Sequence, residues 1–314
     1  MAEEFQALTR AFSGLGGLGV DESTMVSTIA KWQKQPEKRS QFRKGFARFF
    51  TPHGSIEKCE DDYVLHLKTE FSRFKNITVL WAMHPWERDA RWAHHVLHKA
   101  HPSTIIVEIA CTRSSEELLG ARKAYQALFH HSLEEDVAYN VKGNYCNLLV
   151  GLVSAYRYEG PKVNEELAKS EAKELGNAIK SAGTKSDLLA NDEVIRILTT
   201  RSKLHLRATF KHYKEIFGKS IEEDLSSVES LQETVKCLDS PPKYFSQVID
   251  KAFKEGADKR AKDALTRVFV SRAEVDMKEI KEAYNKQYGA KLEDVIAKNT
   301  HGYYKEALLS LAGN

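Results

Sequence analysis

The chain has 314 residues, of which 42% are hydrophobic and 29% charged, and its formal net charge at pH 7 is +3. This composition is that of a globular chain and excludes intrinsic disorder, and the net charge is too small to indicate a nucleic-acid partner. The four cysteines include no CxxC pair, which excludes a zinc ribbon and a disulfide framework and favours a reducing compartment.

Hydrophobic spacing along the chain is that of helices. Apolar residues recur at i, i+3 and i+4, first in Phe5, Leu8, Ala11 and Phe12 and again in Leu118, Ala121, Tyr125 and Leu128. Strand-like alternation is scarce, and Thr51–Ser55 reads as an inserted turn. Prolines at 85, 161, 241 and 242 fall where helices are expected to end. The sequence therefore predicts an all-α protein.

A repeated register runs through the chain. Three segments superimpose without gaps and each ends in an arginine: Ile106–Arg113, Ile195–Arg201 and Thr266–Arg272. An apolar residue follows each arginine at +5 and a tyrosine at +12, namely Tyr125, Tyr213 and Tyr284. Acidic residues follow each tyrosine in Leu133-Glu-Glu-Asp, Ile221-Glu-Glu-Asp and Leu292-Glu-Asp. The first 82 residues fit a looser version of the same unit, with Phe46–Phe50 in place of the tyrosine.

These registers predict four repeats. Their expected limits are 1–82, 83–157, 169–240 and 241–314, with a linker at 158–168. The polar connector Arg157–Asn164 accounts for the longer distance between the second and third arginines. We expect this connector to divide the molecule into two halves.

The register, together with Trp81–Ala90 and Leu152–Gly160, resembles the annexins and in particular their plant branch. The resemblance covers essentially the whole chain. It implies four repeats of five helices each, arranged as a curved, disc-like solenoid whose convex face meets a membrane. It also implies Ca²⁺ as the cofactor and an acidic phospholipid surface as the partner.

The glycine-rich segment Leu15–Glu22 carries the expected calcium site. Its glycines permit the positive-φ conformations that turn successive carbonyls toward a cation, and Ca²⁺ prefers six to eight oxygen ligands. The resemblance implies the carbonyls of Leu15, Gly17 and Gly19 and the carboxylate of Glu70 as the main ligands. The carbonyl of Val20 and the side chain of Glu22 are candidates for a second site.

The other three repeats depart from this pattern. Fifteen residues past each repeat tyrosine, where the family has its acid, the chain has Asn140, Val228 and Asn299. Their loops, Lys99–Thr104, Ser181–Asp187 and Lys254–Lys259, have also lost most of the expected glycines. The sequence therefore predicts one intact calcium site, in the first repeat, and membrane association that is weak or partly independent of calcium.

The resemblance also implies roles for residues outside the calcium loop. Leu18 at the loop tip and Arg73, Phe74 and Lys75 after Glu70 are candidates for lipid contact. Four charged residues match those that line the family's hydrophilic channel, and we interpret them first as structural ion pairs and second as an ion path: Asp89, Glu108, Arg113 and Arg267. Cys111 and Cys237 match a proposed redox pair, although burial as small apolar side chains is the preferred interpretation.

Several motifs have simpler explanations than the functions they suggest. Gly14–Gly19 satisfies a dinucleotide fingerprint but follows a helix pattern instead of a strand, and Gly218-Lys219-Ser220 lacks the first glycine of a P-loop. His94 and His98 share a helix face without a third zinc ligand. The basic segment Lys31–Arg48 could attract anionic lipid, but a solvated helix face is the preferred interpretation. Ile195-Arg196-Ile197, which resembles an actin-binding motif, is expected to pack in the core.

The leading hypothesis is a calcium-dependent, peripheral phospholipid-binding protein of the cytoplasm, without a secretory signal and with a role in calcium or stress signalling. No apolar run reaches 18 residues, so the membrane contact is expected to be peripheral. The alternative is a helical scaffold for protein partners such as actin or other annexins. Ion conduction is a third hypothesis. Enzyme activity is the weakest, because Lys31-Trp32 occupies the region of the family's proposed peroxidase histidine.

Overall fold

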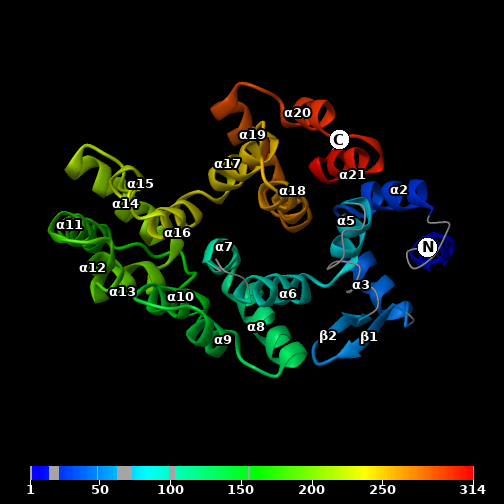
Figure 1. The fold of residues 1–314 in the computed structure, drawn as a ribbon, viewed down its shortest axis with the longest axis horizontal. Helices are drawn as coiled ribbons and strands as arrows, with labels where there is room; N and C mark the ends of the chain where they lie inside the picture. Colours follow the sequence, from blue (N-terminus) through cyan, green and yellow to red (C-terminus); the bar gives the residue numbers. More distant parts are fainter. Residues whose placement is uncertain are drawn as a thin grey trace. The chain divides into compact units, whose positions relative to one another are not determined.

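The computed structural model describes residues 2–13, 21–47, 49–61, 73–98, 103–154 and 156–313. These residues are mostly helical (Figure 1), as the apolar spacing predicts. They form two compact units, one made of residues 1–85 and 242–314 and the other of residues 86–241. The first unit is therefore discontinuous in sequence, whereas the second is one uninterrupted segment.

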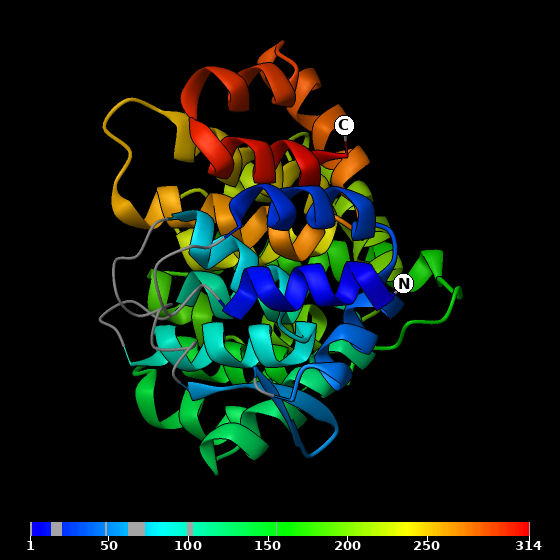
Figure 2. The ribbon, with the colours of Figure 1, turned by 90° about the vertical axis from the view of Figure 1, so that its right-hand side faces the viewer.

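The first unit joins the two ends of the chain. Its elements are α1 (Ala2–Ser13), α2 (Glu22–Trp32), α3 (Pro36–Gly45), β1 (Phe50–His53), β2 (Ile56–Cys59), α5 (Arg73–Ala82), α17 (Pro241–Phe253), α18 (Lys259–Arg272), α19 (Met277–Tyr288), α20 (Leu292–Asn299) and α21 (Gly302–Ala312). Helix α2 packs against α21, and α5 packs against both α18 and α21. The blue and red helices lie side by side in Figure 2. Gln33 fixes this junction, since its buried Nε2 donates a hydrogen bond to the carbonyl of Leu311 at 2.8 Å.

An aromatic cluster fills the N-terminal part of the first unit. Phe12, Trp32, Phe42, Phe49 and Phe50 are each at most 2% exposed. Neighbouring rings lie 5.0 to 6.2 Å apart between centroids, mostly tilted or edge to face, which is the geometry that aromatic quadrupoles favour. These side chains explain why the looser first repeat folds without the register of the other three.

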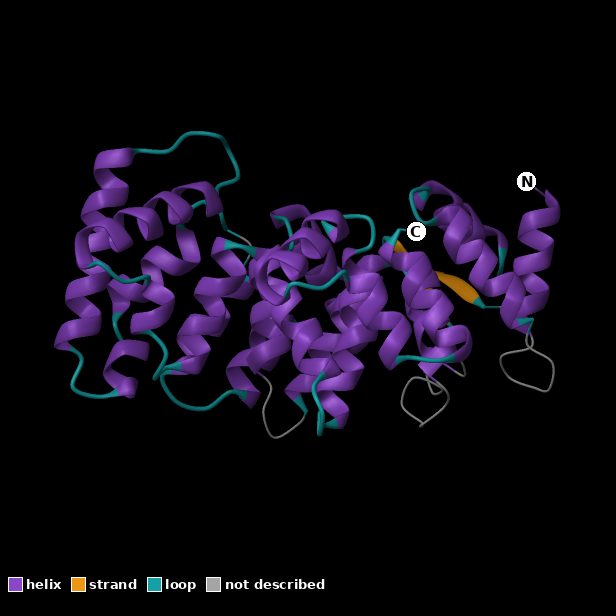
Figure 3. Ribbon diagram, turned by 90° about the horizontal axis from the view of Figure 1, so that it is seen from above, coloured by secondary structure: helices purple, strands orange, loops and turns teal. Residues whose placement is uncertain are grey.

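Strands β1 and β2 form an antiparallel hairpin in which Phe50 pairs with Cys59 and His53 with Ile56. The expectation of an inserted turn at Thr51–Ser55 is thus wrong in part: the segment is a hairpin whose turn is Gly54-Ser55. Gly54 takes a φ of 63°, which a side chain would disfavour. Phe50, Ile56 and Cys59 are buried, so the hairpin packs against the helical core, with β1 against α3. It is the only strand pair in the described residues (Figure 3).

The second unit consists of α6 (Pro85–Leu97), α7 (Ser103–Thr112), α8 (Ser115–Phe129), α9 (Leu133–Asn140), α10 (Tyr145–Val153), α11 (Glu165–Ser181), α12 (Lys185–Leu189), α13 (Asp192–Thr200), α14 (Lys203–Phe217), α15 (Ile221–Asp224) and α16 (Glu229–Asp239). Helix α11 packs against α14, α7 against α16, and α10 against α7, α9 and α13. Pro85 and Pro241 each occupy the first position of a helix, where the missing N–H costs nothing.

Two of the repeat tyrosines form hydrogen bonds with acids that follow them in the register. The hydroxyl of Tyr125 donates to Asp136 Oδ2 at 2.5 Å, and that of Tyr213 donates to Asp224 Oδ2 at 2.7 Å. Each bond fixes the helix that carries the tyrosine to the short helix that follows it. Burial and the adjacent carboxylate raise the pKa of both tyrosines.

The connector after α10 does not divide the molecule. Residues 156–164 lie inside the second unit, and the boundaries between the units fall at residues 85–86 and 241–242. Our expectation of two halves separated at this connector is therefore wrong. The predicted limits of the four repeats remain predictions.

Candidate calcium and membrane-contact sites

The described part of the predicted calcium loop is its C-terminal end, at the start of α2. Asp21 is the N-cap residue: its Oδ1 accepts a hydrogen bond from the Thr24 N–H at 3.0 Å and its Oδ2 one from the Thr24 hydroxyl at 2.5 Å. These bonds, that of the hydroxyl first, lower the pKa of Asp21. Glu22 follows in the first helical turn. Two carboxylates therefore lie where the loop enters α2.

The remaining ligands predicted for this site lie outside the described residues: Leu15, Gly17, Gly19, Val20 and Glu70. The same holds for Leu18. Arg73, Phe74 and Lys75 form the first turn of α5, but their side chains are not among those the structure describes. The main calcium site and these lipid contacts stay predictions.

The positions that replace the family acid in the other repeats are described, and they are poor calcium ligands. Asn140 Nδ2 donates to the carbonyl of Asp136 at 2.8 Å, and Asn299 Nδ2 donates to that of Val295 at the same distance. Each amide is thereby held against its own helix. Val228 is 6% exposed and carries no ligand atom on its side chain. None of the three offers the bidentate carboxylate that calcium sites commonly use.

The corresponding loops of the third and fourth repeats serve as helix caps. Thr184 and Asp187 form a reciprocal capping box, with Thr184 N–H donating to Asp187 Oδ2 at 2.8 Å and Asp187 N–H donating to Thr184 Oγ1 at 3.1 Å. Asp258 caps α18 by accepting from the Ala261 N–H at 2.8 Å. Within the described ranges no group of three or more His, Cys, Asp or Glu side chains could hold a metal ion.

The repeat arginines of the second unit form ion pairs with buried carboxylates. Arg113 donates to both carboxylate oxygens of Asp89, at 2.8 and 2.9 Å, and both side chains are about 5% exposed. Burial alone would lower the pKa of Arg113, but Asp89 and the nearby Glu108 raise it above its usual value. Arg201 pairs with the fully buried Glu171 at 2.6 Å. These arginines fix the ends of α7 and α13 to the first helices of their repeats.

In the fourth repeat the register arginine, Arg272, has partners of a different kind. The guanidinium of Arg272 lies 4.8 Å from the ring centroid of Phe245 and donates to both carboxylate oxygens of Asp276, at 2.8 and 2.7 Å. Arg267 lies in this first unit, whereas Asp89, Glu108 and Arg113 lie in the second. A channel that all four residues line stays a prediction.

The two candidate redox cysteines, Cys111 and Cys237, are wholly buried. Cys111 lies on α7 and Cys237 on α16, and these two helices pack against each other. Burial raises the pKa of the Cys111 thiol to about 11. This thiol is therefore protonated at neutral pH, and because the thiolate is the nucleophile, its reactivity is low.

The remaining motifs from the sequence have structural roles. Gly218 ends α14 with a φ of 74°, and Ser220 forms a capping box with Glu223, so that segment is a turn between helices. The ring of His94 stacks on Phe129 with 3.8 Å between centroids and lies 4.3 Å from that of His98. Ile197 is buried in the core, while Arg196 pairs with acidic residues of α11 and α13.

The basic segment Lys31–Arg48 is only partly a solvated face, which corrects our expectation. Arg39 is 7% exposed and pairs with Glu274 at 2.5 Å, and its guanidinium lies 5.5 Å from the centroid of the Trp81 ring. Arg43 is 5% exposed and pairs with Glu57 at 3.2 Å. These arginines help to hold the first unit together, and the sequence could not show that their partners lie far along the chain or on the hairpin.

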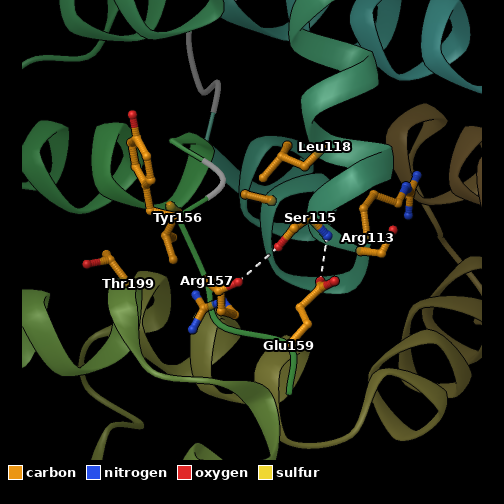
Figure 4. A pocket seen from close by; sticks show the side chains of 10 residues that line it. Arg113, Ser115, Leu118, Tyr156, Arg157, Glu159 and Thr199 are labelled. Atoms are coloured by element: carbon orange, nitrogen blue, oxygen red, sulfur yellow. Dashed lines mark hydrogen bonds between the residues drawn. The ribbon is translucent and has the colours of Figure 1, made fainter.

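Sequence reasoning missed a bonded connector in the second unit (Figure 4). Glu159 accepts a hydrogen bond from the Ser115 N–H at 2.5 Å, and the Ser115 hydroxyl donates to the carbonyl of Arg157 at 3.2 Å. The Arg157 guanidinium donates to the carbonyls of Arg201 and Leu198, at 2.5 and 2.8 Å, at the end of α13. Lys203 donates to the carbonyl of Arg113 at 2.7 Å, at the end of α7. Carbonyls at the C-terminal ends of α7 and α13 thus each accept a hydrogen bond from a positively charged side chain of the other repeat, which is the charge that a helix C-terminus favours.

No helix in the described ranges is both long and apolar enough to cross a bilayer. The small pocket beside the connector is lined by Leu118, Leu152, Tyr156 and Thr199 together with residues of the hydrogen-bonded connector, among them Ser115, Arg157 and Glu159.

Comparison with known proteins shows the family of this chain. The annexin family model matches residues 88–152, 170–230 and 244–311. Annexin D4 of Arabidopsis thaliana is 50% identical over 313 residues, which cover 98% of this chain and 97% of that protein. Annexin D7 of the same plant is 40% identical, with 99% and 95% of the two chains covered. The solved structure of annexin III superimposes with a TM-score of 0.81 at 26% identity, covering 99% of this chain and 93% of its own. The chain belongs to the annexin family.

Proposed function

We propose that this protein binds acidic phospholipid membranes in a calcium-dependent way, through one main calcium site in its first repeat. The protein ligands are the carbonyls of Leu15, Gly17 and Gly19 and the carboxylate of Glu70. The observation that carries the proposal is that the chain belongs to the annexins and keeps both the glycine-rich loop and the acid in one repeat.

The described residues support the restriction to the first repeat. Asn140 and Asn299 direct their amides into their own helices, Val228 is buried, and the third and fourth loops are used as helix caps. The residues present at these three positions do not suit calcium. Asp21 and Glu22, by contrast, put negative charge at the end of the first-repeat loop.

The charge of the proposed calcium ligands predicts how calcium binding depends on lipid. The proposed site supplies one formal negative charge from Glu70, and few charged ligands give weak intrinsic affinity for Ca²⁺. Ligand positions that the protein does not fill are available to phosphoryl oxygens of the membrane. Calcium and lipid then increase each other's affinity by the same factor, as linkage requires.

Vesicle sedimentation across a calcium titration tests the proposal. Vesicles of phosphatidylserine and phosphatidylcholine should pellet the protein, and Glu70→Gln should raise the calcium concentration needed for half-maximal pelleting by at least about tenfold. Glu37→Gln is the matched control, because Glu37 is an exposed carboxylate on α3 of the same unit. Absence of pelleting at millimolar calcium, or equal behaviour of the two variants, would sink the proposal and favour the scaffold alternative.

A further inference from the structure

The C-terminal end of α6 carries two histidines on one side. His94 lies in the last turn of the helix, and His98 directly follows its last residue. They are the only two histidines of the sequence that stand four positions apart, which is the spacing of neighbours on a helix surface. Their ring centroids are 4.3 Å apart, with 33° between the ring planes. Both imidazoles are therefore within reach of one small ion.

Aromatic residues of α8 hold His94 in place. Its ring stacks on that of Phe129, the last residue of α8, with 3.8 Å between centroids and 10° between planes. The ring of Tyr125 lies 5.9 Å from it. His94 is half-buried, whereas His98 is exposed. Because these contacts already restrict one of the two imidazoles, a ligand that binds both costs little further side-chain entropy.

The chemistry of this histidine pair suits a transition metal. Imidazole nitrogen is a preferred ligand of Ni²⁺, Cu²⁺ and Zn²⁺, whereas Ca²⁺ prefers oxygen. The last side-chain torsion of histidine has a broad energy minimum, so small rotations can turn one nitrogen of each ring toward the same ion. The described ranges contain no group of three or more His, Cys, Asp or Glu side chains that could hold a metal. The other coordination positions are therefore open to water.

We infer that His94 and His98 form a binding site for a divalent transition metal, with both imidazoles as ligands. The general order of affinities for nitrogen ligands makes Cu²⁺ the tightest ligand, ahead of Ni²⁺ and Zn²⁺. Since both rings have this arrangement only in the folded protein, the bound metal stabilises the second unit. The site uses no residue of the proposed calcium site and does not depend on it.

Calorimetric titration of the full chain with Ni²⁺ tests the inference. His98→Ala should weaken the tightest binding by about tenfold or more, because a single imidazole cannot chelate. His94→Phe should have a similar effect while it keeps an aromatic ring against Phe129. The matched control is His301→Ala, which removes an exposed histidine with no other histidine within four positions and should leave this affinity unchanged.

Two further measurements identify the ligands. Electron paramagnetic resonance with less than one equivalent of Cu²⁺ should show nitrogen from both imidazoles in the wild type and from a single imidazole in His98→Ala. The affinity for Ni²⁺ should fall steeply between about pH 7.5 and about pH 5.5, because a metal binds only neutral imidazole. Thermal unfolding of the metal-free variants shows whether each keeps its fold, and the exposed position of His98 makes its replacement the mildest.

Three results would overturn the inference. The first is equal affinity of the wild type and a folded His98→Ala for Ni²⁺. The second is an equal loss of affinity in His301→Ala, which would show binding by scattered histidines. The third is displacement of Ni²⁺ by millimolar Ca²⁺, which would indicate a site made of oxygen ligands.

Discussion

At the scale of single residues, stability depends on whether buried charges keep their partners. Asp89 and Arg113 are both nearly inaccessible, and the two hydrogen bonds between them neutralise charges that solvent does not reach. Glu193 and Arg196 form a comparable contact at 2.6 Å, but their side chains are 58% and 40% exposed. Water screens the second pair, so it contributes little.

We expect Asp89→Ala to lower the free energy of unfolding by about 3 to 5 kcal/mol, because it leaves the buried Arg113 without the carboxylate that accepts two of its hydrogen bonds. Glu193→Ala should cost no more than about 1 kcal/mol. Urea unfolding followed by circular dichroism compares the two. Similar unfolding midpoints for both variants would contradict the electrostatic explanation.

The repeat tyrosines predict sensitivity to alkaline pH. Because the folded pKa of Tyr213 is raised above the unfolded value near 10, its contribution to stability is complete below pH 10 and is lost as the pH rises toward the folded pKa. The free energy of unfolding should therefore fall above pH 10 in the wild type and fall less steeply in Tyr213→Phe. Urea unfolding at several alkaline pH values measures this slope, and equal slopes would refute the prediction.

At the scale of elements, close helix packing requires glycine at particular positions. A Cβ on Gly120, within α8, would lie 2.1 Å from the indole ring of Trp86, a half-buried residue of α6, so that ring would have to shift. At Gly45, the last residue of α3, a Cβ would have no neighbouring atom within 4 Å. The same amino acid thus has opposite roles at the two sites.

Replacement of glycine by alanine should change the free energy of unfolding in opposite directions at these two sites. Gly120→Ala should destabilise the protein by about 1 to 3 kcal/mol despite the better helix propensity of alanine. Gly45→Ala should be neutral or stabilising by up to about 1 kcal/mol. Thermal unfolding measures both, and stabilisation by Gly120→Ala would show that Trp86 yields easily.

At the scale of the whole molecule, the two units differ in how they are assembled from the chain. The first needs both chain ends, with α2 packed on α21, whereas the second is continuous. Leu308 on α21 and Leu149 on α10 are each 0% exposed, one in each unit. They provide matched probes of how far a local defect spreads.

We expect Leu308→Ala to cost about 2 to 5 kcal/mol and to reduce hydrogen-exchange protection in residues 22–32, far away in sequence. Leu149→Ala should instead reduce protection around residues 192–200, because α10 packs on α13. Mass spectrometry of exchange in the two variants gives the comparison. Loss of protection confined to 302–312 in Leu308→Ala would contradict the joint unit.

The helical fold could be predicted from the i, i+3 and i+4 spacing of apolar residues and from the repeated register. The register did not show that the tyrosine bonds to an acid that follows it, as it does in the second and third repeats. The hairpin was harder to predict, because its strands are short and Pro52 and Gly54 also suit a plain turn. The connector was misread because Arg157 and Glu159 look like solvated linker residues until the helix ends they bind are known. Of the candidate site, the losses at Asn140 and Asn299 could be predicted from the sequence. The contact between Asn144 and Ser186 could not, because it joins two loops that local spacing does not bring together.

The discontinuous first unit has a consequence for synthesis on the ribosome. Residues 1–85 emerge first but find their packing partners only when 242–314 have been made. At ordinary translation rates of about 5 to 20 residues per second, that delay is roughly 10 to 45 s. The second unit can fold during this interval, while Ile29 and Trp32, buried in the finished protein, wait for α21. The segment that carries the proposed calcium site therefore belongs to the unit that is completed later, and a nascent chain should acquire calcium-dependent membrane binding only after α21 has been released.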